Sequence, residues 1–477
     1  MHDLLYRPGE VFDTDMLLDG RILASAVRDN VTDPATEQVI AAVSCADTDF
    51  INMAVDAARR AFPKWSSDEA LRRRALRAAA TAIRADARWI GRLITLETGK
   101  PIAQGLLEAQ IAADILDYNA SVDIADVSLL KNENQSVHVG RRPLGVVAAI
   151  APWNVPIILL VSKLAPALRA GNTVVAKPSE HSPLSALRLA KVLKDVFPAG
   201  VLNIIAGDGA IGRKLIEHPE IAHISFTGSI ATGKLVAMTA AASLKRVTLE
   251  LGGNDPAIVL PDIDLEAVAE RLFWGAFYNS GQVCFAIKRL YVHETIAAPL
   301  AEILVARCEA TRVGSGFDER TELGPISTKP QFEKFTKMME AARAAGARIR
   351  YGGMRKSQAG FFVSPAIVTD AGADLELVRE EQFGPALPII PFRHVDDAIE
   401  QANDTIYGLG ASVWTTNVQL GCELINLIDA GLGWVNAHGP LFPGSPVSGR
   451  KQSGLGVTGG SWGYDQLVGY QVVNVAR

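Results

Sequence analysis

Three residues, far apart in the sequence, carry side chains that could share one reaction. Cys284 follows the segment Tyr278-Asn279-Ser280-Gly281-Gln282-Val283, Glu250 lies in an apolar run, and Asn154 follows Trp153. A thiolate is a nucleophile, a carboxylate can activate water, and a side-chain amide can donate to an oxyanion. Taken singly, each has a structural alternative: a small buried cysteine, a charge at a strand end, and an asparagine turn.

Two further motifs could bind a nucleotide. Lys177-Pro178-Ser179-Glu180 follows an apolar run, and a carboxylate there can accept from both ribose hydroxyls while repelling a 2′-phosphate. Phe226-Thr227-Gly228-Ser229 opens a predicted helix, whose free N–H groups suit a phosphate. A solvated loop and an ordinary serine N-cap are the respective alternatives.

A Gly-x-Gly-x-x-Gly sequence occurs at Gly207, Gly209 and Gly212, between a predicted strand and a predicted helix. That context is typical of a dinucleotide-binding turn. However, no acidic residue follows at the distance expected for a ribose contact, and the motif comes after the third strand, not the first. A glycine-rich turn without a ligand is an equal alternative.

The elements that must position these motifs alternate between strand and helix. Strands are predicted at 146–150, 172–177, 201–205, 222–226 and 246–251, with helices at 156–169, 183–197, 209–218 and 229–241. Such alternation predicts βαβ units and a parallel sheet. Because ligands bind beyond the carboxyl ends of parallel strands, the motifs that follow these strands should gather at one edge.

A second α/β portion is predicted to deliver the cysteine. A strand at 255–260 and a helix at 265–279 precede it; later strands are expected at 290–292, 367–368, 387–390, 412–414 and 433–436, and helices at 295–311, 330–345, 395–403 and 418–430. Residues 1–50 are predicted to be irregular with short strands, and helices are expected at 52–62 and 68–119, interrupted at 99–101. The arginine-rich run 72–77 is interpreted as a solvated helix face. Strands at 134–141 and 469–475 are expected to be exposed and able to find a pairing partner.

The composition sets the broad class of protein. A chain of 477 residues with 48% hydrophobic and 21% charged residues is expected to form a soluble protein of two or three domains. The net charge of −5 gives no general attraction to nucleic acid or to an anionic membrane. The cysteines Cys45, Cys284, Cys308 and Cys422 form no CxxC pair, which argues against zinc and disulfides. With no signal peptide or membrane-length apolar run recognised, a cytoplasmic location is expected.

Taken together and in order, the motifs resemble the NAD(P)-dependent aldehyde dehydrogenase superfamily over nearly the whole chain. The matching segments are Pro152-Trp153-Asn154, residues 177–180, 226–229 and 250–253, Gly281-Gln282-Val283-Cys284, and residues 380–385. The resemblance implies a Rossmann-like cofactor domain (1–122 and 144–251), an α/β catalytic domain (252–454) and a small β oligomerisation flap (123–143 and 455–477). It also implies a small-molecule aldehyde, NAD or NADP, no metal, and a homodimer or homotetramer.

The resemblance also implies residue roles. Cys284 attacks the aldehyde, the Asn154 amide and the Cys284 N–H hold the oxyanion, and Glu250 activates the water that hydrolyses the thioester. Lys177 is assigned to both the catalytic and the cofactor-binding groups. The remaining cofactor positions are Trp153, Glu180 at the adenine ribose, Gly209 near the adenine, Gly228 and Ser229 at the pyrophosphate, Glu381 at the nicotinamide ribose, and Phe383 beside the nicotinamide. Glu180 favours NAD over NADP, and Val283 stands where many family members carry Cys or Thr.

For the substrate, alignment with the family indicates Val155, Ile157, Ile158, Leu159 and Ser162 after Asn154, Phe285 and Ile287 beside the nucleophile, and Leu441 with Phe442 in a later loop. These residues include no arginine or lysine to bind a second carboxylate, so an apolar aliphatic or aromatic aldehyde is expected. Two alternatives remain: a coenzyme A-acylating semialdehyde dehydrogenase, and a catalytically silent NAD-binding protein on the same scaffold. An esterase side activity is also compatible with an acyl-enzyme.

Overall fold

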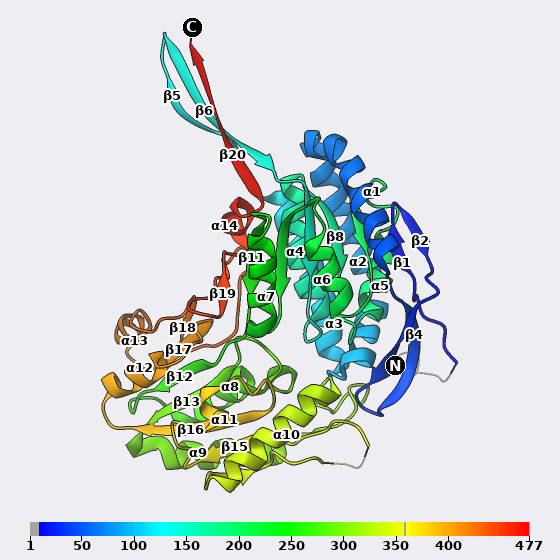
Figure 1. The fold of residues 1–477 in the computed structure, drawn as a ribbon. Coiled ribbons are helices and arrows are strands. Elements are labelled where there is room, and N and C mark those ends of the chain that lie inside the picture. The colour runs from blue at the N-terminus through cyan, green and yellow to red at the C-terminus, as the bar shows by residue number, and fades with distance from the viewer. Residues whose placement is uncertain (1–8, 357–358, 477) are drawn as a thin grey trace.

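The protein contains two α/β sheets and a slender β flap (Figure 1). The structure is a computed structural model and describes residues 9–356 and 359–476. The first eight residues, on which the absence of a signal peptide was judged, lie outside this range. Of the helices described, none combines the length and the apolar character needed to cross a membrane.

The first sheet has eight strands in the order β19-β11-β10-β7-β8-β9-β1-β2. Its five central strands are parallel, which confirms the predicted βαβ pattern: β7 (Val146–Ile150), β8 (Thr173–Lys177), β9 (Leu202–Ile204), β10 (Ile221–Thr227) and β11 (Arg246–Glu250). Antiparallel strands close both edges: β1 (Met16–Leu18) and β2 (Arg21–Leu23) at one, β19 (Gly454–Leu455) at the other.

Both faces of this sheet are buried, because alternate residues of a strand point to opposite sides. Val147 and Ala149 of β7 pack in one core, with α2 (Glu69–Thr98), α3 (Ile102–Ser121) and α4 (Pro156–Ala170). Val146 and Ala148 pack in a second core, to which α1 (Thr48–Ser67), α6 (Gly209–Glu217) and α7 (Ile230–Ala241) contribute. Helix α5 (Leu184–Leu193) contributes to both and ends four residues before the predicted boundary.

The second sheet lies below the first in Figure 1 and has seven strands in the order β14-β15-β16-β13-β12-β17-β18. The strands are β12 (Asp255–Val259), β13 (Ile287–His293), β14 (Arg348–Tyr351), β15 (Ala366–Thr369), β16 (Ala386–Phe392), β17 (Gly410–Trp414) and β18 (Leu432–Val435). The helices associated with this sheet are α8 (Leu265–Phe277), α9 (Glu294–Ala310), α10 (Lys329–Ala344), α11 (Glu376–Arg379), α12 (Val395–Asn403) and α13 (Val418–Ile425). Helix α8 ends two residues before the predicted boundary, which leaves room for the turn that carries the cysteine.

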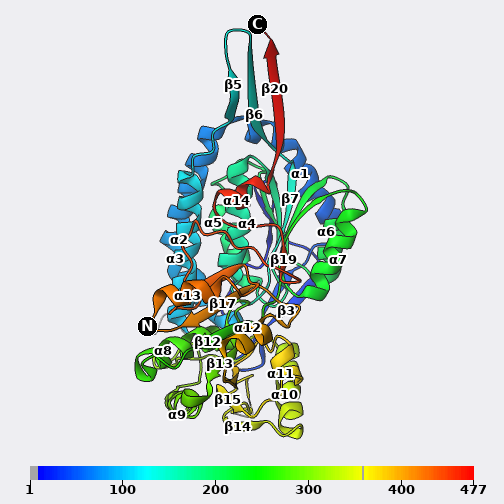
Figure 2. The same cartoon turned by 90° about the vertical axis from the view of Figure 1, so that its left-hand side faces the viewer.

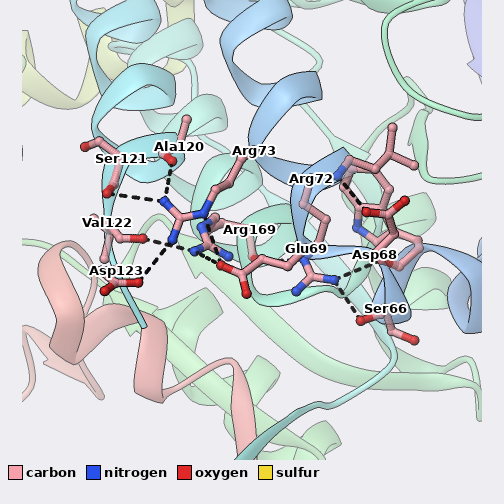
Figure 3. A network of polar contacts seen from close by, with 12 residues as sticks. Ser66, Asp68, Glu69, Arg72, Arg73, Ala120, Ser121, Val122, Asp123 and Arg169 are labelled. Atoms are coloured by element: carbon pink, nitrogen blue, oxygen red, sulfur yellow. Dashed lines mark hydrogen bonds and ion pairs between the residues drawn. The ribbon is translucent and has the colours of Figure 1, made fainter. Parts of the chain in front are cut away.

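The arginine-rich run of α2 is not a solvated face throughout, so that prediction was partly wrong. Arg74 and Arg77 are exposed, but Arg72 is only 8% exposed and donates to the carbonyl oxygens of Trp65, Ser66 and Arg169 (Figure 3). Arg73 reaches the end of α3, where it donates to Ala120 O and pairs with Asp123. Through their several donors these guanidinium groups join α2 to α1, α3 and α4.

The flap is a three-stranded antiparallel sheet that projects from the body (Figures 1 and 2). The two strands predicted to be exposed, β6 (Gln135–Pro143) and β20 (Val468–Ala476), pair with each other over nine residues. A third strand, β5 (Val127–Lys131), was not predicted. The remaining elements are the hairpin β3 (Arg28–Asp33) and β4 (Gln38–Ser44), and the short helix α14 (Gly460–Asp465).

Candidate active site

A tight turn delivers Cys284 from the end of α8. Asn279, Ser280 and Gly281 have φ angles of 52°, 55° and 74°, in the left-handed region. Glycine is required at position 281, because a Cβ there would lie 2.4 Å from Gly384 O. The Asn279 amide stabilises the turn by donating to Asn154 O at 3.0 Å, which joins the second sheet to the first.

Asn154 lies at the nucleophile turn, where the sequence predicted it. Its Nδ2 donates to Gln282 O at 2.9 Å, and the residue is 3% exposed. An amide nitrogen carries two N–H donors, so a second one remains for a ligand.

A buried ion pair fixes Asn154 and was not predicted. Lys100 Nζ donates to Asn154 O at 2.8 Å and to Glu108 Oε2 at 2.7 Å; both side chains are 3% exposed. Glu108 Oε1 accepts from Ile157 N at 2.8 Å and so caps α4. A glutamate in the apolar part of α3 was the available sequence signal.

Glu250 ends β11 and faces the thiol. It is 6% exposed, and burial raises its pKa; the Cys284 thiol, the Lys163 ammonium and the Thr227 hydroxyl act in the opposite direction. Within residues 9–356 and 359–476, neither carboxylate oxygen has a hydrogen-bond partner of ordinary geometry, although the thiol and the hydroxyl lie close enough to lower the pKa. The carboxylate oxygens are therefore able to bind water.

Burial and the Glu250 charge raise the pKa of Cys284 well above that of a free thiol. A thiol of this kind is protonated at neutral pH and needs a base. The adjacent carboxylate is suited to be that base because burial raises its pKa as well.

The lysine beside these groups is Lys163, which sequence reasoning missed. Its Nζ donates to Thr227 Oγ1 at 2.5 Å. Burial lowers the pKa of Lys163 to about 8, although the nearby Glu250 and Cys284 act in the opposite direction. Lys177 lies elsewhere: it forms an ion pair with Glu180 at 3.5 Å, and its other electrostatic neighbours are Asp208 and Cys45. Lys177 therefore lies beside Glu180, at the carboxyl end of β8, and both of its predicted roles stay predictions.

Two helix N-termini follow β9 and β10. At α6, Asp208 accepts from the N–H groups of residues 210 and 211, so two of the first donors are occupied. At α7, Ser229 Oγ accepts from Thr232 N at 3.2 Å and also shares a hydrogen bond of 2.9 Å with Thr232 Oγ1. A Cβ at Gly209 would meet no atom within 4 Å, and the N-terminus of α7 is of the kind that binds a phosphate.

Glu381 and Phe383 form the far side of the site, on the second sheet. Glu381 Oε1 accepts from Gly253 N at 3.1 Å, and burial raises its pKa to about 7. A Cβ at Gly252 would lie 2.4 Å from Glu381 Oε2, so the glycine permits this approach. Phe383 packs edge-on against Trp153 with ring centroids 5.5 Å apart, which brings together groups from both sheets.

The predicted substrate residues fall into two sets. Val155 and, on α4, Ile158, Leu159 and Ser162 are half-buried and lie on one helical face. Ile157 and Ile287 are 0% and 1% exposed and belong to the cores, because they point to the packed side of their elements. Phe285 is half-buried, with its ring 6.2 Å from that of Trp434; Leu441 and Phe442 are 39% and 73% exposed in a loop.

Asn154→Ala should lower the rate of aldehyde oxidation by about 10²–10³-fold, or ~3–4 kcal/mol, because one oxyanion donor is lost. Steady-state NADH production measures this, with Asn119→Ala as a matched control on an outer helix. A rise in KM with kcat unchanged would contradict the assignment, since that pattern indicates a loss of substrate binding alone.

Lys163→Met should move the rising limb of the pH–kcat profile to higher pH. The ammonium lowers the pKa of Glu250, so its removal leaves less carboxylate at pH 7 and slows hydrolysis about 3–10-fold there. Lys163→Arg, which keeps the charge, should retain the profile. An unchanged profile in the methionine variant would show that the ammonium does not act on the base.

Comparison with known proteins agrees with this geometry. Residues 24–473 match the model of the aldehyde dehydrogenase family. A chloroplastic aminoaldehyde dehydrogenase of Arabidopsis thaliana is 38% identical, over 93% of this chain and 92% of that protein. A chloroplastic betaine aldehyde dehydrogenase of Amaranthus hypochondriacus is 37% identical, over 93% and 92%.

Solved structures show the same fold. The NAD⁺ complex of an aldehyde dehydrogenase from Bacillus cereus superposes with a TM-score of 0.96 at 34% identity, covering 99% of each chain. A betaine aldehyde dehydrogenase from Staphylococcus aureus in complex with NAD⁺ gives 0.94 at 32% identity, covering 97% and 95%. The chain therefore belongs to the aldehyde dehydrogenase family, the NAD(P)-dependent oxidoreductases that act on aldehydes.

Proposed function

We propose that the protein oxidises an apolar aldehyde to its carboxylic acid with NAD, through a thiohemiacetal and a thioester on Cys284. One observation carries this proposal: the turn bearing the thiol is hydrogen-bonded to the Asn154 amide and lies beside the buried Glu250. The overall reaction converts aldehyde, NAD⁺ and water into carboxylic acid, NADH and a proton.

The residues divide the reaction into two steps. Glu250 takes the proton of the thiol, the sulfur attacks the carbonyl carbon, and the oxyanion accepts from Asn154 Nδ2 and the Cys284 N–H. Bound NAD would supply a hydride acceptor at this point, so that collapse of the oxyanion could expel hydride and leave a thioester on Cys284. After Glu250 has released the thiol's proton to solvent, it removes a proton from water, which attacks the thioester; the Cys284 thiolate leaves and regains a proton from Glu250.

The cofactor residues fit NAD. Glu180 would accept from the adenine ribose hydroxyls with its partner Lys177 beside it, and its charge disfavours a 2′-phosphate. Gly209 would lie near the adenine, and Gly228 and Ser229 would receive the pyrophosphate. Glu381 would bind the nicotinamide ribose, and Phe383 and Trp153 would limit the nicotinamide side. NADP remains a weaker alternative, and comparing kcat/KM for the two cofactors tests it.

The substrate proposal rests on the half-buried face of α4 and on Phe285. That face carries Val155, Ile158, Leu159 and Ser162. None of these four side chains is a carboxylate that could pair with a cationic substrate, and none is a lysine or arginine that could pair with a substrate carboxylate. Because several relatives are named aminoaldehyde or betaine aldehyde dehydrogenases, a cationic aldehyde is the second candidate.

A panel of aldehydes separates these substrates. We expect the highest kcat/KM for hexanal or benzaldehyde, with lower values for 3-aminopropanal, betaine aldehyde and succinic semialdehyde. A preference for either cationic aldehyde would replace the apolar proposal. Coenzyme A should not raise the rate, because Glu250 supplies the hydrolytic base; a dependence on coenzyme A would favour the acylating alternative, and no NADH with any aldehyde would favour the silent one.

The flap is proposed to mediate assembly into a homodimer or homotetramer. It exposes Leu129 (64%), Tyr470 (57%) and Val472 (56%), which a second copy could cover. Residues 1–122 and 144–251 are proposed as the cofactor domain, 252–454 as the catalytic domain, and 123–143 with 455–477 as the flap. Light scattering tests the assembly.

The four free thiols favour a reducing compartment, and we propose the cytoplasm.

A further inference from the structure

Strand β13 carries a buried lysine close to the nucleophile. Lys288 follows Cys284 by four residues and is 2% exposed. Every residue but one of this strand is buried, and the lysine is buried with them. A buried ammonium is costly unless it has partners. Its neighbour Arg289 donates to main-chain oxygens of residues 254, 401 and 402. These hydrogen bonds account for the burial of the Arg289 guanidinium group. Lys288 points instead to the active site.

The ammonium group of Lys288 contacts the peptide that precedes the nucleophile. Its Nζ donates to Val283 O at 2.6 Å, a distance typical of a strong charge-assisted hydrogen bond. The Val283 carbonyl and the Cys284 N–H belong to the same planar peptide. Because a trans peptide points its C=O and N–H in opposite directions, holding the oxygen also fixes the direction of the N–H.

The charges around Lys288 favour its ammonium form. Glu381, Asp255 and Cys284 each raise its pKa against the larger lowering effect of burial. Asp255 lies on the adjacent strand β12, opposite Ile287, and its side chain is fully buried. The Nζ also lies 5.5 Å from the centroid of the Phe383 ring. The positive charge is thus placed among groups that carry or develop negative charge during the reaction.

We propose that Lys288 is a positioning residue for the oxyanion-forming step: its ammonium group anchors and polarises the Val283–Cys284 peptide, whose N–H is the backbone donor to the oxyanion. Withdrawing electron density from a carbonyl makes the N–H of the same peptide a better donor, the effect seen in chains of hydrogen bonds. This inference rests on the proposed function, since it assigns a role within that reaction.

Lys288→Met, which keeps the length and loses the charge, should slow the pre-steady-state formation of NADH about 10-fold. The change in KM should be under about threefold. Lys288→Gln, which can retain an N–H donor, should recover part of the rate. The ester p-nitrophenyl acetate needs the same oxyanion and no NAD, so its acylation rate should fall by the same factor. Lys245→Met is the matched control: this lysine also donates to two carbonyl oxygens, at Ile216 and His218, far from the site.

Alkylation by iodoacetamide separates oxyanion formation from thiol ionisation. Alkylation passes through no oxyanion, so its rate, corrected for the thiolate fraction from its pH profile, should change less than twofold. An equal loss in alkylation and acylation would overturn the proposal, because Lys288 would then act on the sulfur. A loss confined to the NAD-dependent reaction would also overturn it, in favour of an effect on the cofactor through Glu381.

A methionine variant with wild-type rates would overturn the proposal outright. Should Lys288→Met fail to fold, Lys288→Met with Asp255→Asn removes both buried charges and provides the same comparison; Asp255→Asn alone serves as its reference. The proposed function fails separately, if the wild-type protein forms no NADH from any aldehyde.

Discussion

Replacing Cys284 with serine should abolish aldehyde oxidation while leaving NAD binding intact. A serine hydroxyl is a far weaker nucleophile than a thiolate, and Glu250 is too weak a base to ionise it, so we expect a loss on the order of 10⁴-fold or more in kcat. The substitution removes no partner on which the fold depends, because Cys284 is not a member of the described hydrophobic cores. NADH absorbance measures the rate, and quenching of tryptophan fluorescence measures NAD binding.

Cys308→Ser is the matched control, because Cys308 is a buried thiol in the core packed around α9. This control should reduce stability and retain activity per folded molecule. Full activity in Cys284→Ser would refute the assignment of Cys284 as the nucleophile. Full activity in wild-type protein after stoichiometric alkylation of Cys284 would refute it as well.

Glu250→Gln should convert continuous turnover into a single burst of NADH. Thiol ionisation becomes slower, but each subunit that reacts should stop at the thioester, because the amide cannot accept a proton from water. We expect steady-state kcat to fall about 10²–10⁴-fold, the usual contribution of a general base. Stopped-flow absorbance resolves the burst, and mass spectrometry of the quenched protein should show the acyl group on Cys284.

Glu266→Gln provides the control, since Glu266 is an exposed glutamate in the first turn of α8. The burst and steady-state rates of that variant should match the wild type. If Glu250→Gln lowered both rates without accumulating acyl-enzyme, Glu250 would act only in the first step. Hydroxylamine, which cleaves thioesters directly, should then fail to restore turnover.

The order of strands and helices could be predicted because it depends on local patterns. The five parallel strands of the first sheet lie within one or two residues of their predicted ranges, since buried strands are apolar and bounded by Gly, Pro or Asn. The sequence also predicted that Cys284, Glu250 and Asn154 would meet, because they belong to ordered motifs, and the structure brings the three together. Strand β5 could not: it is short, exposed, and held only by pairing with β6.

The charged groups that support the site were missed for a physical reason. Glu108, Lys163 and Lys288 occur in helices or an apolar strand, and Lys100 in the turn between α2 and α3, where a sequence gives no indication of their partners. Lys163, for example, lies 64 residues from the Thr227 hydroxyl to which it donates. Buried charges are stabilised by tertiary contacts, and these exist only once the sheets have assembled. The same argument explains why Arg72 was expected to be solvated.

The pairing of β19 with β11 has a consequence for protein synthesis. Gly454 lies opposite Glu250 in that pairing, so the strand carrying the base gains its outer neighbour only when residues some 200 positions later have left the ribosome. A nascent chain stalled before residue 454 would hold the nucleophile but leave this strand edge open. We expect the end of β11 that carries Glu250 to stay unpaired on that side in such an intermediate.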